Sequence, residues 1–338
     1  MSIKYQILGK PGKDNALMLW LNAGTKMFRI LFDCGENIFA DLKPSDISSI
    51  DYVFFSHFHL DHAAGFDYFF RRNYDRIKKP IYIFGPEGTT NLIQHHMLGY
   101  TWNMIDDVPG EWFVTDITQE YLVTTKFYAS EGFSRKYRII KIKFDGVLID
   151  NENLKVECAL LNHIIPSAAF KVIEKDWLNI DKASLTNNGF VPGPWIESLK
   201  DLSIDGKKKI QISGKIFGLK ELRKLLLRKH EGEIIAYLTD FLYDKYSKAT
   251  VKRLLKNCKT IICESQYSKD DIKFAKKNYH LTTEQAAAIA KNSGAAKLIL
   301  FHISERYKIY KDYPRLLEEA KAIFPNTFFP EEWEIKKS

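Results

Sequence analysis

Four potential metal ligands lie within one short segment of the chain. Residues 57–62 read His-Phe-His-Leu-Asp-His, and they directly follow the apolar run Tyr52-Val-Phe-Phe. Imidazole nitrogens and carboxylate oxygens are ligands that zinc and related divalent ions take in proteins. Because three of the nine histidines in the chain are in this one segment, a polar loop with unrelated histidines explains it poorly. The pattern predicts a metal site at the end of a strand, where alternate side chains can reach two neighbouring ions.

The elements that would position this segment follow from hydrophobic periodicity. In the first half of the chain, apolar runs bounded by turn residues predict strands over residues 17–21, 28–32, 52–55, 81–84, 122–128, 139–144 and 156–161. Helical spacing predicts helices over 63–76 and 89–98. From Leu219 onward the elements alternate, with helices expected over 219–228, 247–257, 282–293 and 314–324 and strands over 234–238, 260–263 and 297–301. The sequence therefore predicts an α/β protein with a β-rich first half and a βα second half.

Residues 171–215 differ from the rest of the chain. They contain the turn-rich stretch Asn187-Asn-Gly-Phe-Val-Pro-Gly-Pro and no long apolar period. We interpret them as an excursion from the core. The expectation is one domain over residues 1–338 that carries an arm-like or basic insertion at about 171–230.

Composition excludes several classes of protein. The 338 residues include 45% hydrophobic and 27% charged residues, which is ordinary for a globular chain and argues against disordered, collagen-like and coiled-coil proteins. The longest apolar run, Ala16 to Leu21, is far shorter than the ~20 residues of a membrane span. The beginning of the chain lacks the apolar core of a signal peptide, and the four cysteines form no CxxC pair. These features predict a reduced, cytoplasmic protein without a membrane segment.

The segment 57–62 resembles the signature of the metallo-β-lactamase fold, an αββα sandwich of two mixed β-sheets flanked by helices. That family holds a dinuclear metal centre and needs three further ligands at strand ends, for which this sequence offers His163, Asp240 and His302. The resemblance implies two divalent metal ions, with zinc expected and manganese or iron as alternatives. It also implies a set of ligands in which His57, His59 and His163 bind one ion, Asp61, His62 and His302 bind the other, and Asp240 bridges them.

Within that fold, the chain resembles the tRNase Z (ribonuclease Z) endonucleases from about Gly9 to Tyr307. The resemblance rests on Phe32-Asp-Cys-Gly-Glu, His163-Ile-Ile-Pro-Ser, Ile262-Cys-Glu-Ser-Gln-Tyr, Tyr279-His-Leu-Thr-Thr and His302-Ile-Ser-Glu-Arg-Tyr. In the first of these, Asp33 is expected to support the metal loop. The implied activity is hydrolysis of precursor tRNA after the acceptor stem by a metal-activated hydroxide, which releases the 3′ trailer. RNA is then the partner, and a homodimer is an expectation from the same family.

The resemblance also suggests roles for residues outside the ligand set. Asp61 would orient the hydroxide as well as bind a metal, and Glu264 with His280 would supply the proton to the leaving oxygen. Ser167 and Arg306 would contact phosphate or brace the metal ligands. The structural alternatives are a salt bridge at a strand end for Glu264, a helix start for His280 and a loop brace for Arg306.

Positive charge is concentrated between Lys207 and Lys229. This stretch has nine basic residues and one acidic residue, and a patch of one sign is suited to a phosphate backbone. Lys207, Lys208 and Lys209 are the candidate substrate-binding residues here. The alternative is an ordinary solvent-exposed helix face, on which most runs of charged residues lie.

Two other functions compete with tRNA processing. A hydrolase of the same fold could act on a small ester, a cyclic phosphodiester or a lactone. The stretch Pro11-Gly-Lys-Asp-Asn15 matches the Pro-x-Lys-x-Arg-Asn loop of the tRNase Z family only in part and lacks its Arg. This departure favours the alternative function. A non-catalytic RNA-binding protein is the third reading, and the intact set of ligands argues against it.

Overall fold

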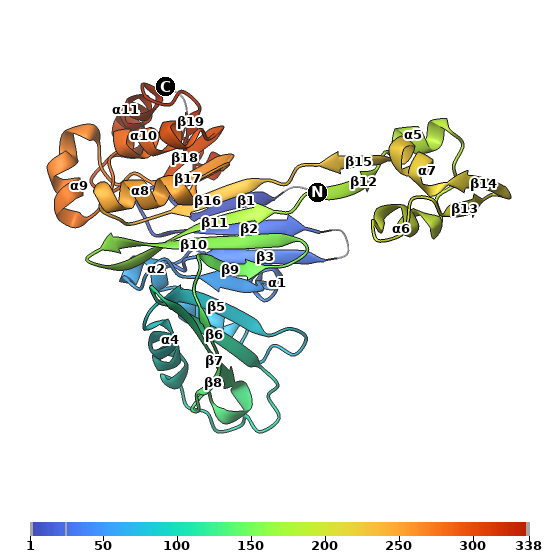
Figure 1. Cartoon of the computed structure of the whole chain (residues 1–338). Coiled ribbons are helices and arrows are strands. Elements are labelled where there is room, and N and C mark those ends of the chain that lie inside the picture. The colour runs from blue at the N-terminus through green and yellow to red at the C-terminus, as the bar shows by residue number, and fades with distance from the viewer. Residues whose placement is uncertain (1–2, 24–25, 336–338) are drawn as a thin grey trace. The chain divides into compact units, whose positions relative to one another are not determined.

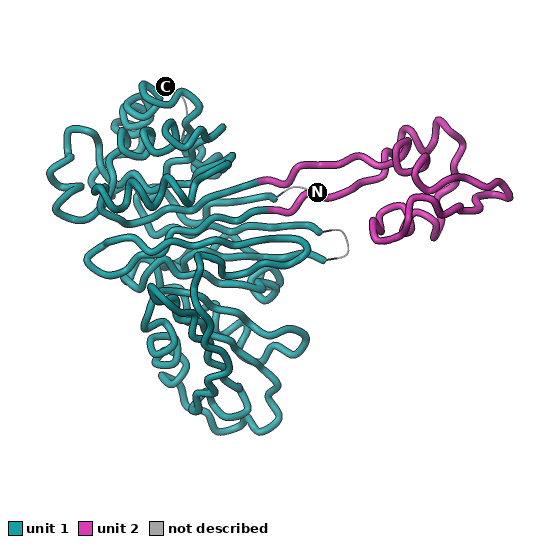
Figure 2. The backbone as a smooth tube through the Cα atoms, viewed as in Figure 1, with its two compact units in different colours: residues 1–173, 234–338 teal, residues 174–233 magenta. Residues whose placement is uncertain are grey.

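The computed structural model describes residues 3–23 and 26–335. The chain divides into two compact units, and Figure 2 shows them in different colours. The first unit contains the residues up to Ile173 and those from Ile234 onward, and the second contains Glu174–Glu233. Each unit has its own hydrophobic core and is described by itself.

The first unit contains an eight-stranded mixed sheet in which the strands follow one another in chain order. Strands β3 to β6 run parallel, while both ends of the sheet are antiparallel. The strands are β1 (Lys4–Gly9), β2 (Asn15–Asn22), β3 (Met27–Phe32), β4 (Tyr52–Phe54), β5 (Ile81–Pro86), β6 (Glu111–Ile117), β7 (Tyr121–Tyr128) and β8 (Tyr137–Lys143).

A second sheet of the same unit has seven strands in the order β19-β18-β17-β16-β11-β10-β9. Strands β16 to β19 are parallel, and β11 pairs with β16 in the antiparallel sense. The strands are β9 (Val147–Asp150), β10 (Leu154–His163), β11 (Ile165–Glu174), β16 (Ile234–Leu238), β17 (Thr260–Glu264), β18 (Lys297–Phe301) and β19 (Thr327–Phe328).

Helices cover the outer faces of both sheets (Figure 1). The first sheet is accompanied by α1 (Pro44–Ile47), α2 (Leu60–Ala63), α3 (Phe66–Arg71), α4 (Thr89–Leu98) and the short η1 (Ala129–Glu131). The second is accompanied by α8 (Lys245–Leu254), α9 (Ile272–Asn278), α10 (Thr283–Ser293), α11 (Ile309–Lys321), η2 (Lys269–Asp271) and η3 (Glu331–Trp333). The αββα arrangement of two mixed sheets between helices is confirmed. No helix among the described residues has the length and apolar character needed to cross a membrane.

The sandwich is held together because the central strands are buried on both faces. Along β2, Leu17 and Leu19 belong to the core between the sheets, whereas Ala16 and Met18 belong to the core under α1, α3 and α4. Successive side chains of a strand point to opposite faces, so a continuous apolar run can fill both cores. This is why β2 shows no alternation of apolar and polar residues.

The second unit has regular structure of which the sequence predicted one helix, the one that corresponds to α7. Strand β12 (Trp177–Ile180) pairs with β15 (Leu227–His230), and β13 (Lys209–Ile212) pairs with β14 (Lys215–Gly218). Its helices are α5 (Lys182–Asn187), α6 (Trp195–Lys200) and α7 (Leu219–Leu226). Their apolar side chains form a core of Leu185, Leu199, Ile212, Leu219, Leu222 and Leu226. Helices and strands as short as most of these give little hydrophobic periodicity from which the sequence could predict them.

Four helix predictions were wrong in their bounds. The helix expected over 247–257 is α8, which begins at Lys245 and ends at Leu254. The helix expected over 63–76 is instead two helices, α2 and α3, which are separated at Gly65. The backbone N–H of Gly65 donates a hydrogen bond to the carbonyl of Cys34. The backbones are so close there that a Cβ atom at Gly65 would collide with the carbonyl oxygen of Gly35. The helix expected over 219–228 ends at Leu226, because residues 227–230 pair with β12. The last helix begins at Ile309 instead of Pro314, and the proline lies inside its first two turns.

Candidate metal centre

The predicted ligands converge where strands of both sheets end. His57 follows β4, His163 ends β10, Asp240 follows β16 and His302 follows β18. The structure brings together all seven, in overlapping groups whose potential ligand atoms lie within 4.8 Å of one another. Residues far apart in the sequence therefore form one cluster, although the strands that deliver them belong to different sheets.

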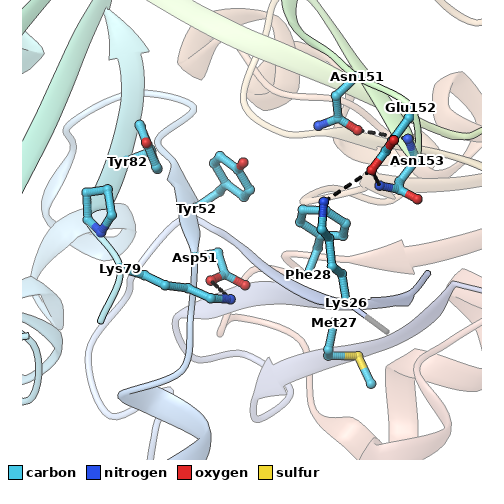
Figure 3. A pocket seen from close by; sticks show the side chains of 11 residues that line it. Lys26, Met27, Phe28, Asp51, Tyr52, Lys79, Tyr82, Asn151, Glu152 and Asn153 are labelled. Carbon is cyan, nitrogen blue, oxygen red and sulfur yellow. Dashed lines mark hydrogen bonds and ion pairs between the residues drawn. The ribbon is translucent and has the colours of Figure 1, made fainter. Parts of the chain in front are cut away.

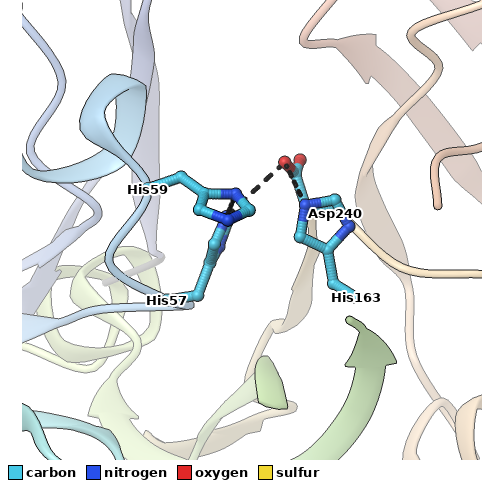
Figure 4. A group of neighbouring side chains, drawn as sticks. All are labelled: His57, His59, His163 and Asp240. Atoms are coloured by element: carbon cyan, nitrogen blue, oxygen red, sulfur yellow. Dashed lines mark hydrogen bonds and ion pairs between the residues drawn. The ribbon is translucent and has the colours of Figure 1, made fainter. Parts of the chain in front are cut away.

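The first group contains His57, His59, His163 and Asp240 (Figure 4). Nε2 of His57 lies 3.0 Å from Nδ1 of His59. Oδ2 of Asp240 lies 3.7 Å from Nε2 of His57 and 3.5 Å from Nε2 of His163. Three imidazoles and one carboxylate thus face a common point, which is a coordination set suited to zinc.

The second group contains Asp61, His62, Asp240 and His302. Nε2 of His62 lies 3.4 Å from Oδ2 of Asp61 and 3.3 Å from Oδ2 of Asp240. His302 lies 3.2 Å from Asp61 through Nε2 and 3.1 Å from Oδ1 of Asp240 through Nδ1. Because Asp240 belongs to both groups, its carboxylate lies where a bridging ligand would be needed.

Buried nitrogen atoms indicate that this cluster fits a cation. Nε2 of His62 and Nδ1 of His302 are buried, and although Asp240 lies 3.3 Å and 3.1 Å away, neither atom makes a hydrogen bond of good geometry among the described residues. A buried polar atom left without a partner costs free energy, and a divalent ion would supply one. Burial and the neighbouring His62 lower the pKa of His57 to about 2, so His57 has the neutral form that a metal ligand requires.

Asp33 holds His62 in place from behind the cluster. Its Oδ2 atom lies 2.9 Å from Nδ1 of His62 and accepts a hydrogen bond of 2.9 Å from the hydroxyl of Tyr237. Its Oδ1 atom accepts a 2.7 Å hydrogen bond from the backbone N–H of Ser56. The contact between Asp33 and Nδ1 of His62 keeps the proton of His62 on that nitrogen and leaves Nε2 free to face the cluster. Asp33 was expected to support the metal loop, whereas Tyr237 was missed, because nothing in the run Ile-Ile-Ala-Tyr-Leu distinguishes its hydroxyl from an ordinary strand residue.

The backbone around the cluster is held in an uncommon conformation. Asp33, Ile164, Asp240, Tyr279 and His302 all have positive φ angles, between 44° and 65°. Few residues other than glycine adopt this region, and such conformations are maintained only where the surrounding structure enforces them. Asp33, Asp240 and His302 turn the chain shortly after β3, β16 and β18, Ile164 lies between β10 and β11, and Tyr279 follows α9. These turns lie at or next to the residues of the cluster.

Glu264 and His280 form a hydrogen-bonded pair beside the ligands. Nδ1 of His280 lies 3.1 Å from Oε2 of Glu264, and Oε1 of Glu264 accepts a 3.1 Å hydrogen bond from the backbone N–H of Phe241. Burial alone would lower the pKa of His280, but the carboxylates of Glu264 and Asp240 raise it to about 9. The two carboxylates thus favour the protonated form of His280, which is the form that can donate a proton.

The same loop also orients one of the ligands. The backbone carbonyl of Tyr279, next to His280, lies 2.8 Å from Nδ1 of His163. That contact fixes a proton on Nδ1 of His163 and leaves its Nε2 atom to face Asp240. One short segment thus sets the geometry of both a ligand and the proton donor.

Two other predicted residues have structural contacts. Ser167 is buried and its hydroxyl lies 3.3 Å from the carbonyl of Thr239, so it braces the residue before Asp240 and has no exposed surface for a substrate. The guanidinium group of Arg306 lies 5.1 Å and 4.8 Å from the ring centres of Tyr267 and Phe274. The side chain of Arg306 is 41% exposed, so it can still meet a phosphate.

The basic segment divides into two kinds of residue. Arg223 donates hydrogen bonds to backbone carbonyls of Leu199 and Ile204, Arg228 lies 3.0 Å from Asp181, and Lys229 lies 2.8 Å from Asp176. These three stabilise the Glu174–Glu233 unit. Lys207, Lys208 and Lys209 belong to the same unit and are exposed.

A hollow at the other ends of the strands is not a second candidate for this chemistry. Its lining includes Tyr52 and Tyr82 near the beginnings of β4 and β5 (Figure 3), whereas His57 follows the far end of β4. Its charged groups neutralise one another, since Nζ of Lys79 lies 3.1 Å from Asp51 and Nζ of Lys26 lies 3.1 Å from Glu152.

Comparison with known proteins finds relatives that match nearly the whole chain. The chain is 36% identical over 327 residues to ribonuclease Z of Deinococcus radiodurans, with 97% of each chain covered. It is 29% identical to ribonuclease Z of Anoxybacillus flavithermus, with 88% of this chain and 83% of the relative covered. Residues 13–118 also match the family described as anti-Pycsar protein Apyc1.

Solved structures share the fold at low sequence identity. The metallo-β-lactamase fold protein YhfI from Bacillus subtilis aligns with a TM-score of 0.56 and 14% identity, covering 97% of this chain and 95% of that one. Human tRNase Z, short form, aligns with a TM-score of 0.52 and 20% identity, covering 90% and 94%. These likenesses establish the metallo-β-lactamase fold.

The role of Asp33 leads to a first prediction. In Asp33→Asn the amide cannot accept hydrogen bonds from all the donors that converge on the carboxylate, so His62 should lose its fixed orientation. We expect the affinity for zinc to fall by ~10–100-fold, measured by competition with a chromophoric chelator. Asp41→Asn, which changes an exposed aspartate, is the control and should bind zinc as the unaltered protein does. Unchanged affinity in a folded Asp33→Asn protein would contradict the role.

Proposed function

The chain belongs to the ribonuclease Z family of metallo-β-lactamase-fold hydrolases, and from this premise we propose that it is an endoribonuclease that cleaves precursor tRNA after the acceptor stem. The observation that carries the proposal is the cluster of seven potential ligands next to the Glu264–His280 pair. A nucleophile and a proton donor are both needed to break a bond to a poor leaving group, and the cluster and the pair provide a place for each. The proposal includes RNA as partner, a homodimer and a cytoplasmic location.

The seven residues named above would hold two divalent ions, with zinc as the ion expected. Two such ions supply a hydroxide nucleophile near neutral pH and neutralise charge on the phosphate oxygens. Asp61 is 42% exposed in its side chain, so its carboxylate can contact the attacking water as well as the cluster. The partial exposure of Asp61 supports an orienting role in addition to that of a ligand.

His280 would protonate the oxygen that leaves. In a cleavage that gives the mature tRNA a 3′-hydroxyl, the P–O3′ bond breaks and O3′ takes a proton. His280 is bonded through Nδ1 to Glu264, so Nε2 of the imidazolium is the atom that can donate. Glu264 stabilises the charged imidazole before the transfer, and Arg306 would contact a phosphate group from its exposed position.

The Glu174–Glu233 unit would contact RNA through its exposed lysines. Lys207, Lys208 and Lys209 are exposed, and no ion pair neutralises them among the described residues. By contrast, Arg223 donates a hydrogen bond to a backbone carbonyl, and Arg228 and Lys229 form ion pairs inside the unit. The first three lysines are therefore the ones available to phosphate groups of the substrate.

Hydrolysis of a small phosphodiester is the second candidate function. It is favoured by the stretch Pro11–Asn15, which keeps Pro11 and Lys13 of the tRNase Z loop but lacks its Arg. The same metal cluster and the same His280 would serve this reaction, so the two candidates differ only in how the substrate is held. Parallel assays with precursor tRNA and with bis-p-nitrophenyl phosphate, each with and without chelator, distinguish them.

The metal proposal predicts a stoichiometry. Protein loaded with zinc should hold about two ions per chain, measured by mass spectrometry of the elements, and a chelator should abolish hydrolysis. His59→Ala should reduce the content to about one ion and abolish hydrolysis, because the first group loses a ligand. His95→Ala removes an exposed histidine of α4 and should change neither quantity. Full activity of His59→Ala would refute the assignment.

The proton donor predicts a dependence on the leaving group. His280→Ala should slow cleavage of precursor tRNA by ~10²–10⁴-fold, while hydrolysis of bis-p-nitrophenyl phosphate changes little because p-nitrophenolate needs no proton to leave. Zinc content should stay as in the unaltered protein. Equal losses on the two substrates would assign His280 a purely structural role.

The exposed lysines of the Glu174–Glu233 unit predict a change in the salt dependence of RNA binding. Replacing Lys207, Lys208 and Lys209 with alanine should weaken RNA binding and reduce the slope of log affinity against log salt by ~0.7–0.9 per lost phosphate contact. Hydrolysis of a small phosphodiester should not change. A charge-matched control replaces Lys252, Arg253 and Lys256, which are exposed on and after α8. If both variants bind RNA as the unaltered protein does, the lysines form a solvated surface.

A further inference from the structure

Strand β8 is the edge strand of the eight-stranded sheet, and it has an unusual surface. It pairs only with β7, and among the described residues no strand lies along its other edge (Figure 1). All seven of its side chains are exposed. The backbone N–H and C=O groups of such an edge are available to another extended chain.

Positive charge covers this edge without any negative charge between. Residues 135–143 read Arg-Lys-Tyr-Arg-Ile-Ile-Lys-Ile-Lys, with five basic residues and no acidic one. Lys136 donates a hydrogen bond to Asn91, and Nζ of Lys141 lies 4.1 Å from the ring centre of Tyr121. These two contacts neutralise no charge. The carboxylate of Glu131 lies near the beginning of the strand, where it accepts a hydrogen bond from Tyr137 and interacts with Arg135. The other basic residues keep the strand cationic.

The two faces of the strand differ in chemistry. Ile140 and Ile142 are opposite Thr124 and Leu122, whereas Lys141 and Lys143 are opposite Val123 and Tyr121. Because side chains alternate along a strand, Ile140 and Ile142 share one face, and Lys141 and Lys143 share the other. Ile140 is 47% and Ile142 is 53% exposed. Exposed isoleucines on an unpaired edge strand are a typical hazard for unwanted pairing.

These features favour a peptide over the other occupants. An added strand uses the free backbone groups, the isoleucine face and the lysine face together, whereas RNA would use only the cations and leave the isoleucines and the backbone edge without partners. A second copy of β8 would bring ten basic residues to one interface with no acid between them. Like charges reject a partner and opposite charges select one, so the charge of β8 selects an acidic strand.

We propose that β8 binds an extended acidic segment of a partner protein, which adds a ninth strand to the sheet. The segment recognised has apolar residues on the face of Ile140 and Ile142, alternating with acidic residues that face Lys141 and Lys143. Backbone hydrogen bonds give affinity in this mode of binding, and the alternating side chains give specificity. The surface is separate from the metal cluster, so the proposal does not depend on the substrate of the enzyme.

The test uses the full chain and a capped, fluorescent peptide of alternating glutamate and valine. We expect saturable binding that weakens with salt, measured by fluorescence anisotropy. The same peptide with N-methyl groups on alternate amides, which removes its donors along one edge, should not bind. Ile140→Glu should weaken binding by about tenfold or more, because it removes an apolar pair and places a negative charge opposite the peptide.

Controls separate this surface from a general effect on the protein. Ile77→Glu changes an 80% exposed isoleucine outside the strand and should bind the peptide normally. The double change of Lys141→Ala and Lys143→Ala, on exposed side chains, should weaken binding and its salt dependence even if Ile140→Glu fails to fold. All these variants should keep their metal content and their hydrolytic activity.

Three results would overturn the proposal. The first is an absence of saturable peptide binding, or equal binding of the N-methylated peptide. The second is binding of oligouridylate that Ile140→Glu abolishes while the peptide does not bind, which would assign the strand to RNA. The third is a dimer in sedimentation velocity that Ile140→Glu dissociates, which would assign the edge to a second copy of the chain.

Discussion

A buried carboxylate surrounded by imidazoles governs the architecture of the metal centre. Asp240 is 2% exposed, and His57, His62, His163, His280 and His302 all approach its oxygens within 3.8 Å. A negative charge in the protein interior is costly unless positive charge compensates it. His62, His280 and His302 provide that compensation, as a bound cation would, and these three histidines hold the pKa of Asp240 well below its usual range against the effect of burial. The loops that carry them must therefore meet at one point.

The two sheets meet this requirement by ending their strands on the same side. β4 delivers the first segment of ligands, while β10, β16 and β18 of the other sheet deliver His163, Asp240 and His302. The orientation of the imidazole rings depends on residues immediately behind them. Asp33, the carbonyl of Tyr279 and Glu264 each fix one imidazole by a hydrogen bond. Orientation of this kind determines which nitrogen of each ring can face a cation.

Basic residues serve different purposes in the two units, and their partners distinguish them. Arg223, Arg228 and Lys229 have contacts inside the Glu174–Glu233 unit, and Arg306 lies over aromatic rings. Lys207, Lys208 and Lys209, like the lysines of β8, are exposed to solvent. A count of charges along the sequence treats all of them alike. Those without an ion-pair partner among the described residues keep their full charge for recognition. The isoleucine-bearing edge of β8 suits a different partner from Lys207, Lys208 and Lys209.

The sequence alone determined the ligand types and the order of the strands that carry them, because dense histidines and apolar runs are local features. It also indicated the αββα class and the Glu264–His280 pair through family resemblance. The tertiary structure decided the remainder. Tyr237 became part of the site only through packing against Asp33, and Ser167 lost its substrate role because β11 buries it. In residues 174–233 the sequence indicated α7, whereas the short strands and the other helices, which pack against one another, were hidden. Burial, long-range pairing and positive φ angles depend on contacts between distant segments, so no local pattern could reveal them.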